Sequence, residues 1–186
     1  MVFIFSLLAT SFLAAETKVL LFAGSTRTES VNKKLINESA EILKSLGATT
    51  TVVDLRDMPI PFYDGDLEAE SGMPENAKKL KSLMLQSDVV VISTPEYNGS
   101  IPAVLKNAID WMSRKESGGS SRDAYTGKKF ILLSTSPGSS GGKRGLAHLK
   151  AVIDNISKGQ ALELSIPNAA IKDNKALREV LIEGMK

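Results

Sequence analysis

The stretch VLLFAGSTRTESVN, residues 19–32, decides the fold. Its first five residues, Val19–Ala23, form a continuous apolar run, which is typical of a strand buried on both faces. Gly24 then begins a polar segment rich in hydroxyl side chains, and apolar residues at helical spacing follow between Leu35 and Leu46. A buried strand that passes through a polar turn into a helix predicts the first half of a parallel β-α-β unit.

The rest of the chain repeats this alternation. Four more extended runs follow, at Thr51–Val53, Val89–Ile92, Phe130–Leu133 and Leu162–Ile166. Helical spacing of apolar residues fills the gaps between them, at 77–84 after Pro74, at 101–112, at 146–156 and at 177–181. Five strands alternating with five helices predict an α/β fold whose parallel sheet is covered on both faces. The polar stretch 113–127 predicts a connecting loop.

The composition of the runs also predicts the order of the strands. The first, third and fourth runs are continuously apolar, whereas the second is half polar and the fifth alternates. Continuous runs belong at the centre of a parallel sheet and the other two at its edges. With right-handed crossovers this gives the order 2-1-3-4-5, a flavodoxin-like, five-stranded parallel sheet. A ligand is then expected at the switch point between strands one and three.

Composition excludes several classes of function. The chain has 186 residues, with 23 Lys and Arg against 21 Asp and Glu, so its net charge is +2. A nucleic-acid binder usually carries a concentrated basic excess, and we therefore expect no nucleic-acid partner. The chain has no cysteine and one histidine, His148, which excludes a thiolate nucleophile and a thiolate or histidine-rich metal site, so that any metal would need carboxylate or carbonyl ligands. If the protein is an enzyme, a bound cofactor is expected to carry the chemistry.

The first sixteen residues differ from the rest. Met1–Ala15 (MVFIFSLLATSFLAA) is apolar and uncharged, and it is shorter than the roughly 20 residues that cross a bilayer as a helix. Two interpretations fit it equally: a signal peptide, or an extension ahead of the domain. We expect residues 17–186 to form one domain, without a stable membrane anchor.

The loop after the first run, Gly24–Asn32, carries four hydroxyl side chains and one cation ahead of a helix. A helix N-terminus presents unpaired N–H groups and a partial positive charge, which suit a phosphate, and Arg27 can add charge-assisted hydrogen bonds. Helix capping by Ser30 would explain one hydroxyl and leave Arg27 without a role. We therefore predict a phosphate site, although the glycine spacing of dinucleotide and Walker A loops is absent.

Two further loops follow the other central runs. Ser93–Pro102 contains Asn98-Gly99, a turn signal that tolerates positive φ, and Tyr97, which could stack on a ligand. Its backbone could read the edge of a flat heterocycle. Ser134–Gly142 contains a G-x-S-x-G pattern ahead of His148. No acidic residue lies between that serine and the histidine, which disfavours a serine hydrolase.

Together these loops resemble the NADPH-dependent FMN reductase family, which includes quinone, azo-dye and chromate reductases of flavodoxin-like fold. Gly24–Asn32 resembles the family's G-S-x-R-x-x-S-x-N phosphate loop. Pro95–Pro102, followed by Leu105–Trp111, resembles its P-E-Y-N-G-S-I-P and L-K-N-A-I-D-W segments. Gly141–Arg144 is similar to a family Gly-Gly-x-Arg segment. The resemblance covers residues 18–166.

The resemblance implies non-covalently bound FMN, contacted by three groups of residues. Ser25, Arg27, Ser30 and Asn32 would hold its phosphate, Pro95, Glu96, Tyr97, Asn98 and Gly99 would contact its ring system, and Ser136 would close the third side.

The resemblance also implies an NAD(P)H-dependent oxidoreductase. NAD(P)H, as co-substrate, would pass a hydride to FMN, and a small-molecule acceptor would take the electrons: a quinone, an azo compound, chromate or free flavin. No catalytic side chain is required. The family commonly forms homodimers or homotetramers with flavin sites near the interface, and Trp111, Met112 and the helix that precedes them are candidate contributors to it. We expect a cytoplasmic protein, because reduced NAD(P)H is found in that compartment.

Two alternatives have other functions. A flavodoxin-like FMN electron carrier would have no NAD(P)H turnover, but such carriers are usually strongly acidic, unlike this chain. A regulatory module without turnover would have no evident use for both cofactor motifs.

Overall fold

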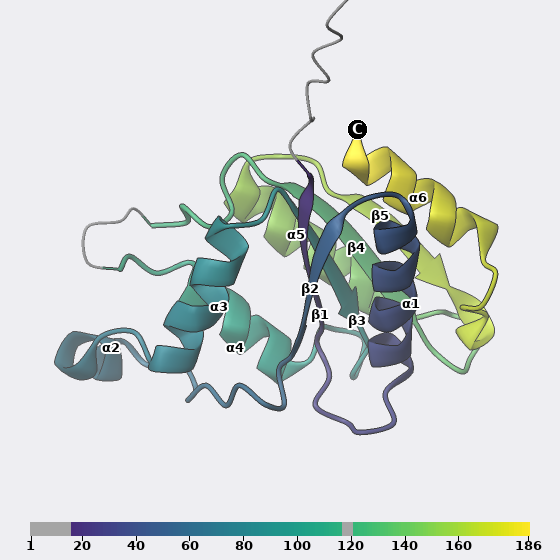
Figure 1. Cartoon of the computed structure of the whole chain (residues 1–186). Helices are drawn as coiled ribbons and strands as arrows, with labels where there is room; N and C mark the ends of the chain where they lie inside the picture. Colours follow the sequence, from purple (N-terminus) through teal and green to yellow (C-terminus); the bar gives the residue numbers. More distant parts are fainter. Residues whose placement is uncertain (1–15, 117–120) are drawn as a thin grey trace, which may run out of the picture.

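The predicted sheet is present in the computed structural model, which describes residues 16–116 and 121–186 (Figure 1). Five strands form one sheet in the order β2-β1-β3-β4-β5, and every neighbouring pair is parallel. Their bounds are β1, Lys18–Ala23; β2, Thr49–Asp54; β3, Val89–Thr94; β4, Lys129–Thr135; and β5, Leu162–Ile166. The flavodoxin-like order predicted from run composition is confirmed.

Burial explains why the order could be predicted. Every residue of β3 is buried, as is all of β1 and β4 except the first residue of each. The edge strands β2 and β5 are largely exposed or half-buried, and Val52 in β2 is 45% exposed. A central strand is covered by helices on both faces, so only apolar residues are favourable along its whole length.

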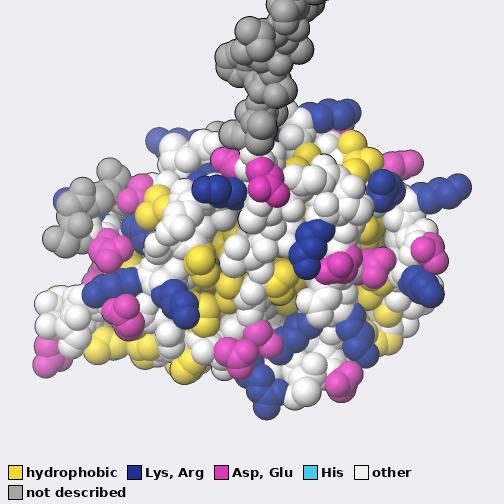
Figure 2. Space-filling view, viewed as in Figure 1, with side chains coloured by type: hydrophobic (Ala, Val, Ile, Leu, Met, Phe, Trp, Pro, Cys, Tyr) yellow, Lys and Arg dark blue, Asp and Glu magenta, His cyan; other side chains and the backbone are white. Residues whose placement is uncertain are grey.

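Helices cover both faces of the sheet (Figure 1). Helices α1 (Val31–Ser45) and α6 (Lys175–Met185) pack on one face. The other face carries α3 (Glu75–Leu85), α4 (Ala103–Met112) and α5 (Lys143–Ser157). A 3-10 turn, Pro167–Ala169, follows β5. On the face in Figure 2, basic and acidic side chains are interspersed, as the small net charge suggests.

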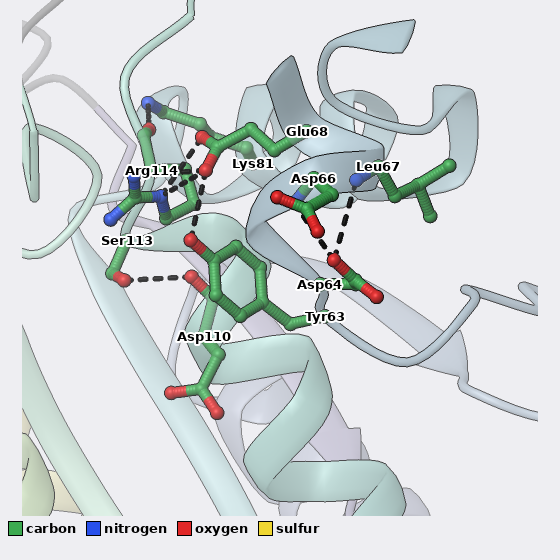
Figure 3. Close-up of polar contacts among 9 residues, drawn as sticks. All are labelled: Tyr63, Asp64, Asp66, Leu67, Glu68, Lys81, Asp110, Ser113 and Arg114. Carbon is green, nitrogen blue, oxygen red and sulfur yellow. Dashed lines mark hydrogen bonds and ion pairs between the residues drawn. The ribbon is translucent and has the colours of Figure 1, made fainter. Parts of the chain in front are cut away.

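The short helix α2, Gly65–Ser71, was not predicted, because it has seven residues and no buried apolar stripe. Asp64 caps it by accepting hydrogen bonds from the N–H groups of Asp66 and Leu67 (Figure 3). An ion pair between Glu68 and Arg114 attaches α2 to the end of α4, with N–O distances of 2.9 Å.

Tyr63 completes this attachment, because its hydroxyl donates to Glu68 at 2.9 Å and its ring lies under Arg114 (Figure 3). The hydrogen bond to Glu68 is the main reason that the pKa of Tyr63 is raised.

The expectation that Trp111 and Met112 help to form a subunit interface is wrong. Both side chains are fully buried inside this chain, and the indole N–H of Trp111 donates to the Pro61 carbonyl at 2.8 Å. Met112 belongs to the stripe of α4 that packs against the sheet, whereas Trp111 packs with Met73 and Ala77. The choice between signal peptide and extension falls on residues 1–15, outside the described residues. Within the described part of the chain, no helix is long and apolar enough to span a membrane.

Candidate functional site

A cleft of about 290 Å³ opens at the carboxyl ends of β1, β3 and β4. Three loops form its walls, one after each of these strands. Its lining consists of Ser25, Arg27, Glu29, Ser30, Val31, Asn32, Pro95, Glu96, Tyr97, Thr135, Ser136 and Pro137. The ten predicted site residues are all in this lining except Asn98 and Gly99, which lie in the turn just beyond it.

The β1–α1 loop is held close to the sheet at its start. The N–H of Gly24 donates to the carbonyl of Ser93 at 2.8 Å, and a Cβ at position 24 would lie 2.7 Å from Leu105. Ser25 is buried and accepts from the N–H of Arg27. The guanidinium of Arg27 is exposed and has no hydrogen-bond or ion-pair partner among the described residues. A cation is therefore available at the rim of the cleft.

Helix α1 begins directly under this loop. Ser30 is its N-cap, and its hydroxyl accepts from the N–H of Lys33 at 3.4 Å. The N–H groups of Val31 and Asn32 have no hydrogen-bond partner within the described residues. Free N–H groups and the helix dipole give this end a partial positive charge, and Arg27 adds a full charge beside it. This arrangement suits an anion with several oxygen acceptors.

The side chain of Asn32 has a structural role. It is 1% exposed, and its amide donates to the carbonyl of Thr135 at 3.1 Å while its oxygen accepts from the hydroxyl of Ser93 at 2.7 Å. The same oxygen accepts from the N–H of Thr135 at 3.2 Å. Asn32 therefore joins the ends of β3 and β4 below the cleft. Its predicted contact with a phosphate stays a prediction.

The loop after β3 forms a tight turn, as its sequence predicted. Tyr97 and Ser100 exchange two backbone hydrogen bonds of 2.9 and 3.0 Å. Asn98 and Gly99 between them have φ angles of 53° and 79°, the left-handed region that asparagine tolerates and glycine favours. Tyr97 is 43% exposed at the cleft, so its ring is available to a ligand.

Glu96 lines the cleft, and its carboxylate is bonded to the start of α5. Its carboxylate pairs with Arg144 at 2.7 Å and accepts from two backbone N–H groups of the same helix. The hydrogen bond from Arg144 is the largest cause of a lowered pKa for this carboxyl.

The loop after β4 closes the third side. The hydroxyl of Ser136 donates to the carbonyl of Gly138 at 3.1 Å, and its own carbonyl accepts from the N–H of Ala169. His148, in α5, pairs with Ser100 at 3.1 Å and not with Ser140 of the G-x-S-x-G pattern. The described residues contain no group of three or more His, Cys, Asp or Glu side chains that could hold a metal.

Sequence reasoning missed the support that the end of β2 gives to the β1–α1 loop and to α1. Asp54 pairs with Lys33 at 2.6 Å and accepts from the N–H of Arg56 at 2.9 Å, while the guanidinium of Arg56 donates to the hydroxyl of Thr28. These contacts connect the end of an edge strand to the loop. They follow no local spacing, so neither composition nor periodicity indicated them.

A loop suited to an anion at the switch point of a 2-1-3-4-5 sheet, with a turn beside it that could face a flat ring, is typical of a flavodoxin-like nucleotide-binding protein. Residues 17–169 match the model of the NADPH-dependent FMN reductases, and the chain belongs to this family. It is therefore an oxidoreductase that uses FMN with NAD(P)H as electron donor.

Curated relatives and solved structures agree with this family assignment. A quinone reductase of Pseudomonas putida is 39% identical over 124 residues, 67% of this chain and 62% of that protein's length. An NAD(P)H-dependent FMN reductase of Pseudomonas aeruginosa is 31% identical over 181 residues, 92% of each chain. The structure of an NAD(P)H:acceptor oxidoreductase from Paracoccus denitrificans has a TM-score of 0.69 at 27% identity, covering 91% of this chain and 93% of the other.

Proposed function

We propose that the cleft holds FMN and that this chain reduces a quinone with electrons from NAD(P)H. The observation that carries the proposal is the unpaired guanidinium of Arg27 beside the free N–H groups at the start of α1. Ser25, Arg27, Ser30 and Asn32 hold the phosphate in this proposal. The backbone of Pro95–Gly99 faces the ring, and Ser136 closes the third side.

The chain's own contribution to the reaction is position and hydrogen bonding. FMN, when bound, supplies the hydride-accepting ring. The rigid turn between Tyr97 and Ser100 presents backbone groups in a fixed orientation, which stabilise charge on a neighbouring ring without reorganising. Arg27 and the start of α1 orient the ligand through its phosphate. No side chain of the cleft is needed as an acid or base in this scheme.

The acceptor is proposed from the relatives. Several of them are named quinone reductases, including those of Pseudomonas putida and Escherichia coli. An azo compound, chromate or free flavin would use the same site. An FMN electron carrier differs from all of these because it would not turn over NAD(P)H.

One experiment tests the function. The purified protein is loaded with excess FMN, desalted, and assayed for NADPH and NADH oxidation with benzoquinone. We expect a yellow 1:1 complex and quinone-dependent oxidation of the nucleotide. Failure to retain flavin would refute the proposed site. Retained flavin without nucleotide oxidation would favour the carrier.

We also propose a homodimer or homotetramer in the cytoplasm, in which residues 17–186 form the catalytic domain. Light scattering measures the oligomeric state. N-terminal sequencing of the native protein tests the location, because a mature start near Glu16 would mean export.

A further inference from the structure

The start of α5 lacks a cap of its own. The N-cap position is occupied by Gly142, which has a φ of 82° and no side chain to accept a hydrogen bond. The N–H groups of Arg144 and Gly145 instead donate to one carboxylate oxygen of Glu96, at 3.1 and 3.5 Å. A carboxylate from another loop, 48 residues earlier in the chain, therefore caps the helix N-terminus.

Arg144 engages the other oxygen of this carboxylate. Its Nε and a terminal nitrogen both lie 2.7 Å from Oε1 of Glu96. The glutamate side chain is 10% exposed, whereas that of Arg144 is 78% exposed. Both oxygens of Glu96 are thus bonded to residues of α5, and the helix dipole favours the negative charge at the N-terminus of α5.

The backbone of the loop at Glu96 and at Ser100 packs closely on the same helix. A Cβ at Gly145 would lie 3.1 Å from both the Glu96 Cα and the Ser100 carbonyl oxygen. Any larger residue at position 145 would therefore push the loop outward by a few tenths of an ångström. His148, one turn later, pairs with the Ser100 hydroxyl at 3.1 Å. The loop 95–100 is held at both ends by the first two turns of α5.

We propose that Glu96 is a positioning residue: its carboxylate fixes the loop 95–100 on the start of α5 and so sets the position of the wall that faces the flavin ring. The inference rests on the proposed function, since it concerns the same cleft. It gives Arg144 a role within the chain, as the partner that fixes Glu96. In this proposal the carboxylate acts through the loop that it holds.

The test compares FMN with riboflavin, which has the ring but no phosphate. A displaced wall weakens both ligands by the same factor. For Glu96→Ala we expect about 10-fold weaker binding of each, because charged hydrogen bonds are lost. Glu96→Gln keeps an oxygen for the two backbone N–H groups, so most of the affinity returns. Arg144→Ala removes an exposed partner and weakens both ligands about 3-fold. Fluorescence titration of the apo protein gives the constants.

A second readout separates positioning from a general loss of stability. The visible absorption band of bound riboflavin shifts in Glu96→Ala and returns in Glu96→Gln if the wall has moved. Lys106→Ala is the matched control, because it breaks an ion pair of the same length on α4, with Asp110 at 2.7 Å. This control is expected to leave both affinities and the band unchanged.

Three results would overturn the inference. The first is unchanged binding of both ligands in folded Glu96→Ala. The second is selective loss of FMN over riboflavin, which would place Glu96 at the phosphate. The third applies if Glu96→Ala does not fold: unchanged binding in Arg144→Ala, whose exposed side chain can be removed without a cavity. Wild-type protein that binds neither ligand would instead refute the proposed function, and the inference with it.

Discussion

Helices α1 and α5 begin at the same edge of the sheet, but their N-termini are in different states. Helix α1 is capped by its own Ser30, and its first N–H groups remain free beside Arg27. Helix α5 is capped by Glu96 from another loop, and its arginine is paired. Two glycine- and serine-rich loops thus have opposite roles. One is open to an external anion, whereas the protein's own carboxylate already satisfies the other.

The largest effect is expected from removing the cation at the open end. Arg27→Ala should weaken FMN about 10- to 100-fold, since a charge-assisted contact contributes roughly 1.5–3 kcal/mol. Riboflavin should bind as before, because it has no phosphate. Equilibrium titration of both ligands makes the comparison. Arg178→Ala, on α6, is the control that removes the same charge at an exposed position far along the chain. Equal weakening of both ligands would show that Arg27 is not at the phosphate.

A smaller effect, on both ligands alike, is expected from straining the loop that α5 supports. Gly99 has a φ of 79°, which a β-branched residue adopts at a cost of about 1–3 kcal/mol. Gly99→Val should therefore weaken FMN and riboflavin together, by about 10-fold. Gly47→Val is the matched control, because Gly47 has a φ of 87° at the far end of α1. Both variants should lose similar thermal stability, and weaker flavin binding by Gly47→Val would contradict the assignment.

Lowering the pH should affect the N-termini of α1 and α5 in different ranges. A phosphate monoester loses its second charge below about pH 6, so FMN binding should weaken a few-fold between pH 7 and 5 while riboflavin binding does not. The pKa of Glu96 is lowered below 4.5 in the folded protein. The stabilisation from Glu96 is then complete above pH 4.5 and is lost as the pH falls through the folded value. Titrations from pH 7 downward should show FMN and riboflavin binding weakening together only below pH 4.5. Parallel loss above pH 5 would contradict this.

The smallest effect is expected at His148. Its hydrogen bond to Ser100 is exposed, and no step of the proposed reaction needs a titrating side chain. His148→Ala should leave the rate of flavin reduction by NADPH within about 3-fold of wild type, whereas losing a general base costs about 10²–10⁴. Stopped-flow measurement on the FMN-loaded protein decides between these. Abolished reduction with FMN still bound would require an acid–base role for His148.

The sequence predicted the sheet well, because strands buried on both faces, such as Val89–Thr94, contain continuous apolar runs. The cleft could be predicted for a related reason: loops after adjacent parallel strands meet at one edge. Arg27 was recognisable because a cation ahead of a helix start has few structural uses. Each of these inferences depends on neighbours in sequence or on strand order alone.

What could not be predicted depends on contacts between distant residues. The partner of Glu96 lies 48 positions away, so the motif did not indicate that its carboxylate bonds to the start of α5. Its predicted contact with the flavin stays a prediction. Trp111 looked available for an interface because periodicity does not show that Met73 and Ala77, from a distant segment, cover its side chain. Helix α2 was missed because its stability depends on the Asp64 cap and the Glu68–Arg114 pair, not on a buried stripe.

The partners of Asn32 lie far away in the sequence, and this affects how the protein folds. Its side chain bonds to Ser93 and Thr135, 61 and 103 positions later in the chain. Contacts between such distant residues form only after long loops have closed, which slows folding. On the ribosome, the first loop is made early but cannot acquire its final neighbours until β4 has emerged. A chain cut before Thr135 would therefore contain all of residues 24–32 and still lack the Thr135 backbone groups that hold Asn32 in place.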